Sequence, residues 1–395
     1  MVAGIDEMSV DKFSKWFRKE GETLIEGLLQ VTYQPQSIRQ VEIPKHKGKG
    51  GVRKLGIQTV TDRIIQQAIS QILKPIYERK FSDNSYGFRS KRITHQALQK
   101  ASEYLAEGRE VLVDMDLKSF FDEVNHDRLM YQLSETIKDK ILLRLIRKYL
   151  RSGILLGGLI EQRQKGTPRG SPLSSLLSNI VLDELEKELE NRGHCFIRYA
   201  DDFLIFVRSQ KERKIVKESI GKFIENKLKL KVNETKSKVC YSNQTTFLGY
   251  TIQRDSNLSI AEDSVLRLKS KIRKIAKRNR LRSFEQIISE LNPVLRVWLQ
   301  YFRYSKSHWI LRNLDSLIHR KLLCYRIKQT KKTIGLQRFL AKQGVAKWNS
   351  WILALSGNGY WRKSGSSQAH QAMNLKWFEE QVLYSLLTNH ELLNN

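Results

Sequence analysis

The sequence contains few cysteines and no long apolar run. Its three cysteines, Cys195, Cys240 and Cys324, are an odd number and form no CxxC pair, so neither a disulfide framework nor a zinc knuckle is indicated. No stretch approaches the roughly 18 apolar residues needed to span a bilayer, and the N-terminus lacks the pattern of a signal peptide. We therefore expect a cytoplasmic protein that does not enter membranes.

Acidic residues are scarce relative to basic ones. Lys and Arg together number 70 against 41 Asp and Glu, which leaves a formal net charge of +29 at pH 7. This excess favours a polyanionic partner, and nucleic acid is the first candidate. Hydrophobic residues make up 40% of the 395 residues, which is enough apolar surface for a folded chain of about two to four packed units.

Two short apolar segments carry clustered carboxylates. Residues 111–116 and 196–205 have the pattern of strands, and they contain Asp116 and the adjacent pair Asp201 and Asp202. Adjacent residues of a regular strand point to opposite faces, so we expect a tight hairpin turn that presents the pair, with Asp116 approaching from a separate strand. Carboxylates flanked by apolar strands repel one another unless a cation is present. The pattern favours a metal site for phosphoryl transfer; a solvated turn is the alternative.

Nine short motifs follow one another along the chain. In sequence order they are Gly4-Ile5-Asp6, Val41-Glu42-Ile43-Pro44-Lys45, Val60-Thr61-Asp62-Arg63, Ser85-Tyr86-Gly87-Phe88-Arg89, Asp116 with Phe120-Phe121-Asp122, Gly166-Thr167-Pro168-Arg169-Gly170, Tyr199-Ala200-Asp201-Asp202, Asn233-Glu234-Thr235-Lys236-Ser237 and Phe247-Leu248-Gly249-Tyr250. This ordered series resembles the reverse transcriptases encoded by group II introns. The end of the chain is similar to that of the bacterial group IIC branch, which has no nuclease.

The resemblance implies an α+β fold, the right-hand polymerase, with fingers, a palm built on an antiparallel sheet and a helical thumb. The expected bounds are fingers over 1–85, palm over 86–255, thumb or maturase domain over 256–345 and a C-terminal DNA-binding segment over 346–395. A change to long, basic helical periodicity near residue 262 suggests a boundary there. The sequence shows no zinc cluster after residue 324 and no His-Asn-His core, so we expect no endonuclease. It also begins some twenty residues later than the family usually does, which suggests a shortened N-terminal extension.

The implied activity is RNA-directed DNA polymerisation, coupled to maturation and mobility of an intron. Two Mg²⁺ ions are the implied cofactors, and Mn²⁺ is expected to substitute. The implied partners are intron RNA or an RNA template, a DNA primer or target, and deoxynucleoside triphosphates. We expect a monomer in a bacterial cytoplasm.

The resemblance also assigns roles to individual residues. The implied metal ligands are Asp116, Asp201, Asp202 and the backbone carbonyl of Leu117. Residues implied to contact the incoming nucleotide are Lys45, Arg53, Arg39, Phe121, Arg169 and Lys236. Basic residues expected to contact nucleic acid are Arg63, Arg89, Arg296, Arg303 and Lys306.

Several of these roles have plain structural alternatives. Phe121 is expected to lie under the sugar and exclude a 2′-hydroxyl, or else to pack in the core; Phe120 is expected to be a core residue on the other strand face if the strand continues. Lys236 is either a general acid near the leaving pyrophosphate or a surface lysine. Asp114 lies on the same strand face as Asp116 and either joins the metal site or makes a structural hydrogen bond.

One position departs from the family pattern. Arg169 stands where the family normally has Gln next to the incoming nucleotide and the template base. Because Arg is longer and charged, the role of the Gln does not carry over, and contact with template phosphate or altered fidelity are the expectations.

Three rival functions stay open. A maturase that has lost polymerisation would keep RNA binding, although the intact Asp116, Asp201 and Asp202 argue against it. A host-adapted reverse transcriptase serving defence or repair would share every motif. A two-metal nuclease would also use paired carboxylates, and the cationic loop around Lys45 makes it the least favoured.

Overall fold

The computed structural model describes residues 3–44, 52–156 and 159–394. They divide into two compact units, one ending at Ser242 and the other beginning at Asn243. Helices and antiparallel strands occur in both units, which confirms the α+β class that the sequence predicts. None of the described helices is long and apolar enough to cross a membrane.

The first unit opens with a helix and a small sheet. Helix α1 spans Val10–Leu29, strands β1 and β2 span Ile38–Pro44 and Val52–Ile57, and α2 spans Val60–Glu78. A four-stranded sheet has the order β2-β1-β4-β5, in which β4 (Ile154–Leu156) pairs with β1 and β5 (Leu159–Glu161) lies at the edge. Strands assigned by sequence to the palm therefore complete a sheet that begins in the predicted fingers.

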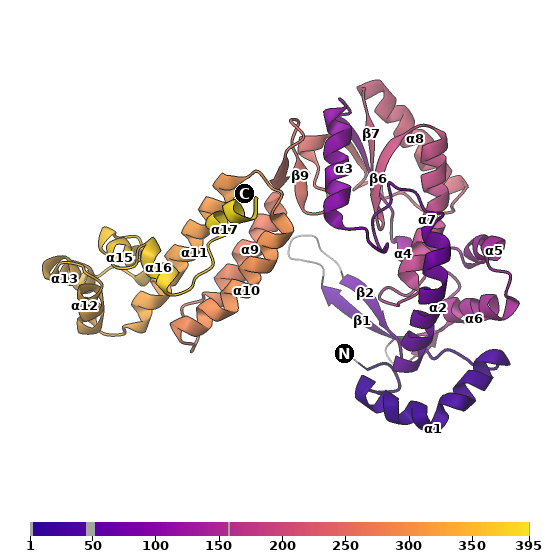
Figure 1. Cartoon of the computed structure of the whole chain (residues 1–395), viewed down its shortest axis with the longest axis horizontal. Helices are drawn as coiled ribbons and strands as arrows, with labels where there is room; N and C mark the ends of the chain where they lie inside the picture. Colours follow the sequence, from indigo (N-terminus) through magenta and orange to yellow (C-terminus); the bar gives the residue numbers. More distant parts are fainter. Residues whose placement is uncertain (1–2, 45–51, 157–158, 395) are drawn as a thin grey trace. The chain divides into compact units, whose positions relative to one another are not determined.

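The central sheet of this unit has the order β6-β7-β3-β8 and is antiparallel throughout. Its strands are β3 (Val111–Asp116), β6 (Cys195–Tyr199), β7 (Asp202–Val207) and β8 (Lys238–Tyr241). The strands are almost continuously apolar because helices cover both faces. Helix α3 (Thr94–Ala106) lies on one side of the strands, while α7 (Ser174–Asn191) and α8 (Gln210–Asn226) lie on the other (Figure 1).

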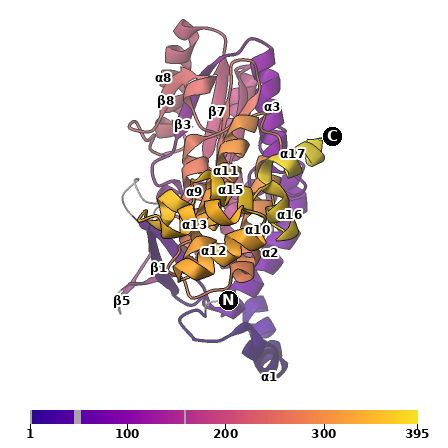
Figure 2. The ribbon, with the colours of Figure 1, turned by 90° about the vertical axis from the view of Figure 1, so that its left-hand side faces the viewer.

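The two faces of this sheet can be told apart from the alternation along β3. Val111, Val113 and Met115 belong to the large buried core that also contains residues of α7 and α8. On the opposite face, Phe206 of β7 contacts Tyr104 of α3, with ring centroids 5.3 Å apart. Figure 2 shows α3 and α8 on opposite sides of β3 and β7 from a second direction.

The chain leaves β3 by a sharp turn, and the expectation of a continuing strand is wrong. Ser119 has a φ of +50°, and Phe120–Glu123 form the short helix α4. Phe120 is nevertheless buried, with 1% of its surface exposed, which confirms its core position. Two further helices follow, α5 (His126–Thr136) and α6 (Lys140–Arg151).

The second unit is mainly helical. After a 3₁₀ turn at Ser242–Gln244, it contains a hairpin of β9 (Tyr250–Ile252) and β10 (Leu258–Ile260) and the helices α9 to α17. The helix bounds are Glu262–Ile275, Phe284–Phe302, His308–Gln329, Thr333–Lys342, Lys347–Leu355, Tyr360–Lys363, Ser367–Ala372, Leu375–Glu380 and Leu386–Asn394.

The units meet about twenty residues before the boundary that the change in periodicity suggests near residue 262. The reason is the packing of the β9–β10 hairpin. Tyr250 donates a hydrogen bond of 2.5 Å to the carbonyl of Tyr301, and its ring lies 5.0 Å from that of Phe302. The hairpin thus shares the core of α10, although its own sequence looks like a continuation of the sheet before it.

Candidate active site

The hairpin of β6 and β7 carries the Asp pair. Tyr199 pairs with Asp202 in the ladder, so Ala200 and Asp201 form a two-residue turn. Ala200 has a φ of +60°, the sign that tight hairpin turns require at their first central position, where glycine is usual. On the other side of β7, Asp202 lies directly opposite Asp116, the last residue of β3. The predicted hairpin and the approach of Asp116 from a separate strand are both confirmed.

Three carboxylates share one face of the sheet. Directly opposed residues of antiparallel strands lie on the same face, as do residues two apart in one strand. Asp114 therefore lies on the face of Asp116 and Asp202, as the sequence predicts, and it pairs in register with Lys238 of β8. The result is a concentration of negative charge at the end of the sheet where the turn lies.

Residues 233–237 hold Asp116 in position. The side-chain amide of Asn233 donates to Asp116 Oδ1 at 2.9 Å, and Lys236 Nζ donates to Asp116 Oδ2 at 3.0 Å. The backbone amide of Asp116 donates to Ser237 Oγ at 3.0 Å, and its carbonyl accepts from the Asn233 amide at 2.8 Å. Lys236 thus ion-pairs with a predicted metal ligand, while Asn233 and Ser237 are supporting residues that sequence reasoning did not assign individually.

The Asp202 carboxyl has a perturbed acidity. Partial loss of hydration, followed by repulsion from Asp201, Asp116 and Asp114, raises the pKa of Asp202 from 3.8 to about 6, and Lys236 acts in the opposite direction. Asp202 is exposed by accessible surface, so the loss of hydration reflects crowding around the carboxyl and not enclosure in the core. Much of the strain is therefore repulsion between carboxylates, which a bound cation relieves.

Removing the Asp202 charge is expected to stabilise the metal-free protein. Between pH 3.8 and about 6 the folded state binds more protons at this site than the unfolded state, so the free energy of unfolding falls as pH rises. Asp202→Asn should remove this penalty and gain about 1 kcal/mol near pH 7.5, a value reduced for the exposure of the group, and less at pH 5. Thermal unfolding in a chelator at both pH values measures the gain; Glu107→Gln, an exposed carboxylate at the end of α3, is the control. An equal gain at both pH values would contradict the repulsion argument.

The donor set fits a divalent cation. Carboxylate oxygens are the ligands that Mg²⁺ and Mn²⁺ prefer, and the repelling Asp116, Asp201 and Asp202 gain most from a cation. In the part of the chain that the structure describes, no three Asp, Glu, His or Cys side chains already stand as a complete metal-binding group. Magnesium sites for phosphoryl transfer commonly take one or two carboxylates and complete their shell with waters and substrate phosphates. The pair Asp116 and Asp202 suits a site of that kind.

The turn is anchored by Arg198, which sequence analysis did not single out. Its Nη1 donates to the carbonyl of Ala200 at 2.8 Å and to Asn179 Oδ1 at 3.0 Å, and its Nη2 donates to Ser85 Oγ at 2.6 Å. Its Nε forms an ion pair with Glu186, and both side chains are only 1% exposed. Burial raises the pKa of Glu186, and the Arg198 charge opposes that rise. A buried arginine therefore fixes the backbone between the two strands.

The segment Ser85–Arg89 packs directly against the same turn. A Cβ on Gly87 would lie 2.1 Å from the amide nitrogen of Ala200, so only glycine allows this approach. The Gly87 carbonyl accepts from Asn179 Nδ2 at 3.1 Å, and the Tyr86 amide donates to the Arg198 carbonyl at 2.9 Å. This motif supports the site through its backbone.

Phe121 lies next to the loop of residues 166–170. Its ring is half-buried, and the guanidinium of Arg169 lies over it at 5.2 Å from the centroid. The Phe121 carbonyl accepts from the Thr167 amide at 2.6 Å, and Gly166 has a φ of +85° at a point where a Cβ would meet that carbonyl at 2.8 Å. The residue that departs from the family pattern therefore contacts the predicted sugar gate.

Other predicted nucleotide and metal contacts are less well defined. Lys45 lies outside the described residues, and Arg53 is described only through its backbone, which pairs with Ile43 in the β1–β2 ladder. Arg39 is exposed on β1. Leu117 is buried directly after Asp116 and forms a backbone bridge to Val232.

The basic residues predicted to contact nucleic acid differ in their surroundings. Arg63 is half-buried in the first turn of α2. Arg89 has a side chain only 4% exposed, paired with Glu78 at 2.9 Å and donating to the Ser85 carbonyl at 3.2 Å. Its contacts make Arg89 a support for the Ser85–Arg89 segment, and the structure does not favour its prediction as a nucleic-acid contact.

The other three lie near the end of α10 in the second unit. Arg296 is exposed with its guanidinium 5.4 Å from the Tyr384 ring centroid, and Arg303 lies over Tyr304 at 4.6 Å. Lys306 is exposed in the loop that follows. Two of the three thus have aromatic neighbours, as the interleaved pattern suggests.

Comparison with known proteins identifies the class. Residues 43–252 match the family described as reverse transcriptase (RNA-dependent DNA polymerase), and residues 265–344 match the group II intron, maturase-specific domain. The first match covers more than half of the chain, which therefore belongs to the reverse transcriptase family. This confirms the family indicated by the ordered motifs and agrees with the right-hand polymerase class. Members of this family depend in general on divalent metal ions.

Two relatives show the same association with introns and bacteria. The group II intron-encoded protein LtrA of Lactococcus lactis subsp. cremoris is 31% identical over 315 residues, covering 63% of this chain and 52% of LtrA. Protein YkfC of Escherichia coli K12 is 31% identical over 290 residues, covering 64% of this chain and 76% of YkfC. The chain thus spans about half the length of LtrA.

Among solved structures, telomerase from Candida tropicalis in complex with a fragment of telomeric RNA is similar. It is 15% identical with a TM-score of 0.49, covering 94% of this chain and 67% of that one.

Proposed function

We propose that this chain is an RNA-directed DNA polymerase of the group II intron type, which also binds intron RNA as a maturase. The observation that carries the proposal is the register of β3 against β7, which sets Asp116 directly opposite Asp202 beside a turn fixed by a buried arginine. In a chain of the reverse transcriptase family, this is the arrangement that metal-assisted nucleotidyl transfer needs.

The carboxylates are proposed to hold two Mg²⁺ ions, for which Mn²⁺ would substitute. Asp116, Asp201, Asp202 and the Leu117 carbonyl are the proposed ligands, and the ions would supply activation of the primer 3′-hydroxyl and neutralisation of the triphosphate. Lys236 Nζ, now 3.0 Å from Asp116 Oδ2, would have to release that oxygen. It would then be free to donate a proton or a hydrogen bond to the departing pyrophosphate.

The incoming nucleotide is proposed to lie between the predicted fingers and the carboxylates. Lys45, Arg53 and Arg39 are the proposed triphosphate ligands, a task suited to Lys charge and Arg geometry. Arg169 is the proposed neighbour of the nucleotide through its contact with Phe121. The division into fingers, palm, thumb and C-terminal DNA-binding segment at residues 85, 255 and 345 is part of the same proposal.

The partners are proposed to be intron RNA or an RNA template, together with a DNA primer or target, in a bacterial cytoplasm. The supporting observations are the net charge of +29 and the match of residues 265–344 to the maturase-specific domain. Arg296, Arg303 and Lys306 belong to that segment, while Arg63 belongs to the polymerase segment. Phosphate and 2′-hydroxyl contacts are the expected mode of binding.

Primer extension tests the proposal. Purified protein, a labelled DNA primer annealed to RNA, all four deoxynucleoside triphosphates and Mg²⁺ should give full-length product, and none should form in excess chelator. Restoration by Mn²⁺ would agree with the carboxylate ligands. Binding of RNA without extension in either metal would favour the maturase without polymerase activity, and shortening of the primer would favour the nuclease.

Phe121 is expected to control the choice of sugar. A ring beneath the sugar leaves no room for a 2′-oxygen, so Phe121→Val or Phe121→Ala should admit ribonucleotides. We expect discrimination to fall by about tenfold or more, which corresponds to about 1.4 kcal/mol or more. Single-nucleotide incorporation with deoxyribonucleotide and ribonucleotide over a range of concentrations gives the ratio of kcat/KM.

Phe120 serves as the matched control because its ring lies 5.3 Å from that of Phe121 but is buried. Its truncation to Ala should cost about 3–5 kcal/mol of stability and leave discrimination unchanged in the fraction that folds. Unchanged discrimination in a folded, active Phe121→Ala enzyme would remove the gate and leave the carboxylate argument intact.

A further inference from the structure

Helix α6 has two faces of opposite character. Ile146, Tyr149 and Leu150 are buried in the core of the first unit. The other face carries a run of cations at helical spacing, which we call the α6 basic stripe: Lys140, Arg144, Arg147 and Arg151. Positions four, three and four residues apart lie on one side of a helix, so these charges form a continuous line.

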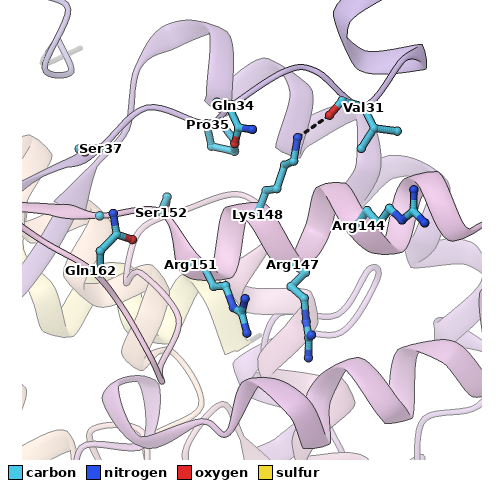
Figure 3. A pocket seen from close by; sticks show the side chains of 11 residues that line it. Val31, Gln34, Pro35, Ser37, Arg144, Arg147, Lys148, Arg151, Ser152 and Gln162 are labelled. Carbon is cyan, nitrogen blue, oxygen red and sulfur yellow. Dashed lines mark hydrogen bonds between the residues drawn. The ribbon is translucent and has the colours of Figure 1, made fainter.

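The stripe borders the larger of the cavities found in the described part of the chain. This cavity has a volume of about 440 Å³ and lies between α6, the loop before β1 and the residues around β4. Polar groups from Gln34, Ser37, Ser152 and Gln162 line it together with the α6 cations (Figure 3). Figure 3 shows Arg147 and Arg151 extending to the same side of α6, while Lys148 reaches toward Val31.

The cavity has a fixed wall. Lys148 Nζ donates to the carbonyl of Val31 at 2.5 Å and to that of Tyr33 at 2.8 Å. Val31 has a φ of +61°, a costly conformation for a β-branched residue that surrounding contacts must hold. A Cβ on Gly153 would lie 2.5 Å from Ile160, so the opposite wall is also close-packed. The shape is therefore built into the fold.

The charge of this surface is poorly neutralised from within. Arg147 forms an ion pair with Asp127, which is itself exposed. Arg144 and Arg151 are exposed, and no carboxylate among the described residues forms an ion pair with either. Their seven-residue separation corresponds to about 10 Å along the helix, which is longer than a single phosphate group.

We propose that the α6 basic stripe and its cavity form a site for an RNA backbone, separate from the carboxylates at the end of β3. Guanidinium groups bind phosphate in two-pronged fashion, and the amide and hydroxyl groups of the cavity suit ribose hydroxyls. Helix α6 lies apart from β6 and β7 in Figure 1, so RNA held here contributes affinity and not chemistry. The choice of RNA over other polyanions rests on the proposed function.

Charge removal tests the site by binding and by catalysis. In the full chain, R144Q/R147Q/R151Q should weaken binding of a long structured RNA about tenfold or more and flatten the dependence of log K on log salt by about 2. The matched control is K211Q/R213Q/K214Q on α8, which removes three surface charges from the same unit. It should change both quantities much less. Thermal unfolding verifies that both variants fold, and R144Q/R151Q repeats the test with the Asp127 pair intact.

A change of opposite sign sharpens the test. Asp127→Asn removes the carboxylate that pairs with Arg147 and should strengthen RNA binding and steepen its salt dependence, which a merely structural role of the stripe would not produce. Primer extension on a short RNA–DNA duplex at saturation should be the same for wild type and for the triple arginine variant.

Equal weakening by both triple variants would overturn the proposal in favour of diffuse charge. Loss of extension on the short duplex by the arginine variant alone would overturn the separation from the catalytic site. Because binding is measured without polymerisation, a wild type that binds RNA but extends nothing would refute the polymerase and leave this site standing.

Discussion

Asp202→Asn is expected to abolish nucleotide incorporation in a protein that is more stable than wild type without metal. The raised pKa of Asp202, about 6, reflects loss of hydration and then repulsion by Asp201, Asp116 and Asp114. A neutral amide relieves that strain but offers a cation one weaker oxygen ligand. Opposite signs for stability and activity are the mark of a residue kept for chemistry at the expense of folding.

The size of the activity loss follows from the metal. A bound divalent ion contributes several kcal/mol to the transition state, and a loss of about 4 kcal/mol corresponds to about 10³-fold in rate. Single-turnover primer extension, in which product release does not limit the rate, should therefore show at least that reduction. Affinity for the RNA–DNA duplex, measured in the same buffer, should stay within about threefold of wild type because phosphate contacts by Lys and Arg dominate it.

Two companion variants complete the experiment. Glu107→Gln, on α3, should match wild type in rate. Asp114→Asn decides the alternative left open by sequence: a loss as large as that of Asp202→Asn would place Asp114 among the ligands, and a small loss would make it structural. Incorporation by folded Asp202→Asn within about tenfold of wild type would refute the metal role, since one ligand removed should cost more than 1.4 kcal/mol.

The carboxylates could be predicted because their signal is local. Alternation along residues 111–116 places Asp114 and Asp116 on one face, and Tyr199 to Asp202 between two apolar runs indicates a tight hairpin. The structure confirms both through the ladders β3–β7 and β6–β7. A single sequence does not supply the register between strands more than eighty residues apart, and the ordered motifs replaced it with a family resemblance.

The supports of the site were missed because their partners are distant in sequence. Arg198 bonds to Ser85, 113 residues earlier, and Asn233 bonds to Asp116, 117 residues earlier. A charged residue inside an apolar strand is the local signal that could have identified Arg198, since a buried arginine must be paired. The end of β3 was misjudged for a similar reason, because the turn at Ser119 needs a positive φ that its sequence does not announce.

Arg198→Leu is expected to destabilise the first unit by about 3–5 kcal/mol and to remove activity as well. It leaves Glu186, which is 1% exposed, as a buried carboxyl without its cation, and breaking one side of a buried pair carries a cost of this size. Because the pKa of Glu186 is already raised by burial, losing Arg198 should raise it further. The folded state then holds a proton that the unfolded state releases, so the penalty should be smaller at pH 5 than at pH 8. Denaturant unfolding at the two pH values measures it.

The double variant R198L/E186L separates stability from positioning. Two apolar side chains in place of a buried ion pair are often neutral for folding, so at least about half of the lost stability should return. Activity should not return, because the carbonyl of Ala200 has lost its 2.8 Å donor and the turn that carries Asp201 has a positive φ at Ala200 that needs external support. Recovery of both quantities would mean that Arg198 serves only the core. Recovery of stability alone would make it the residue through which the buried interior sets the geometry of the carboxylates.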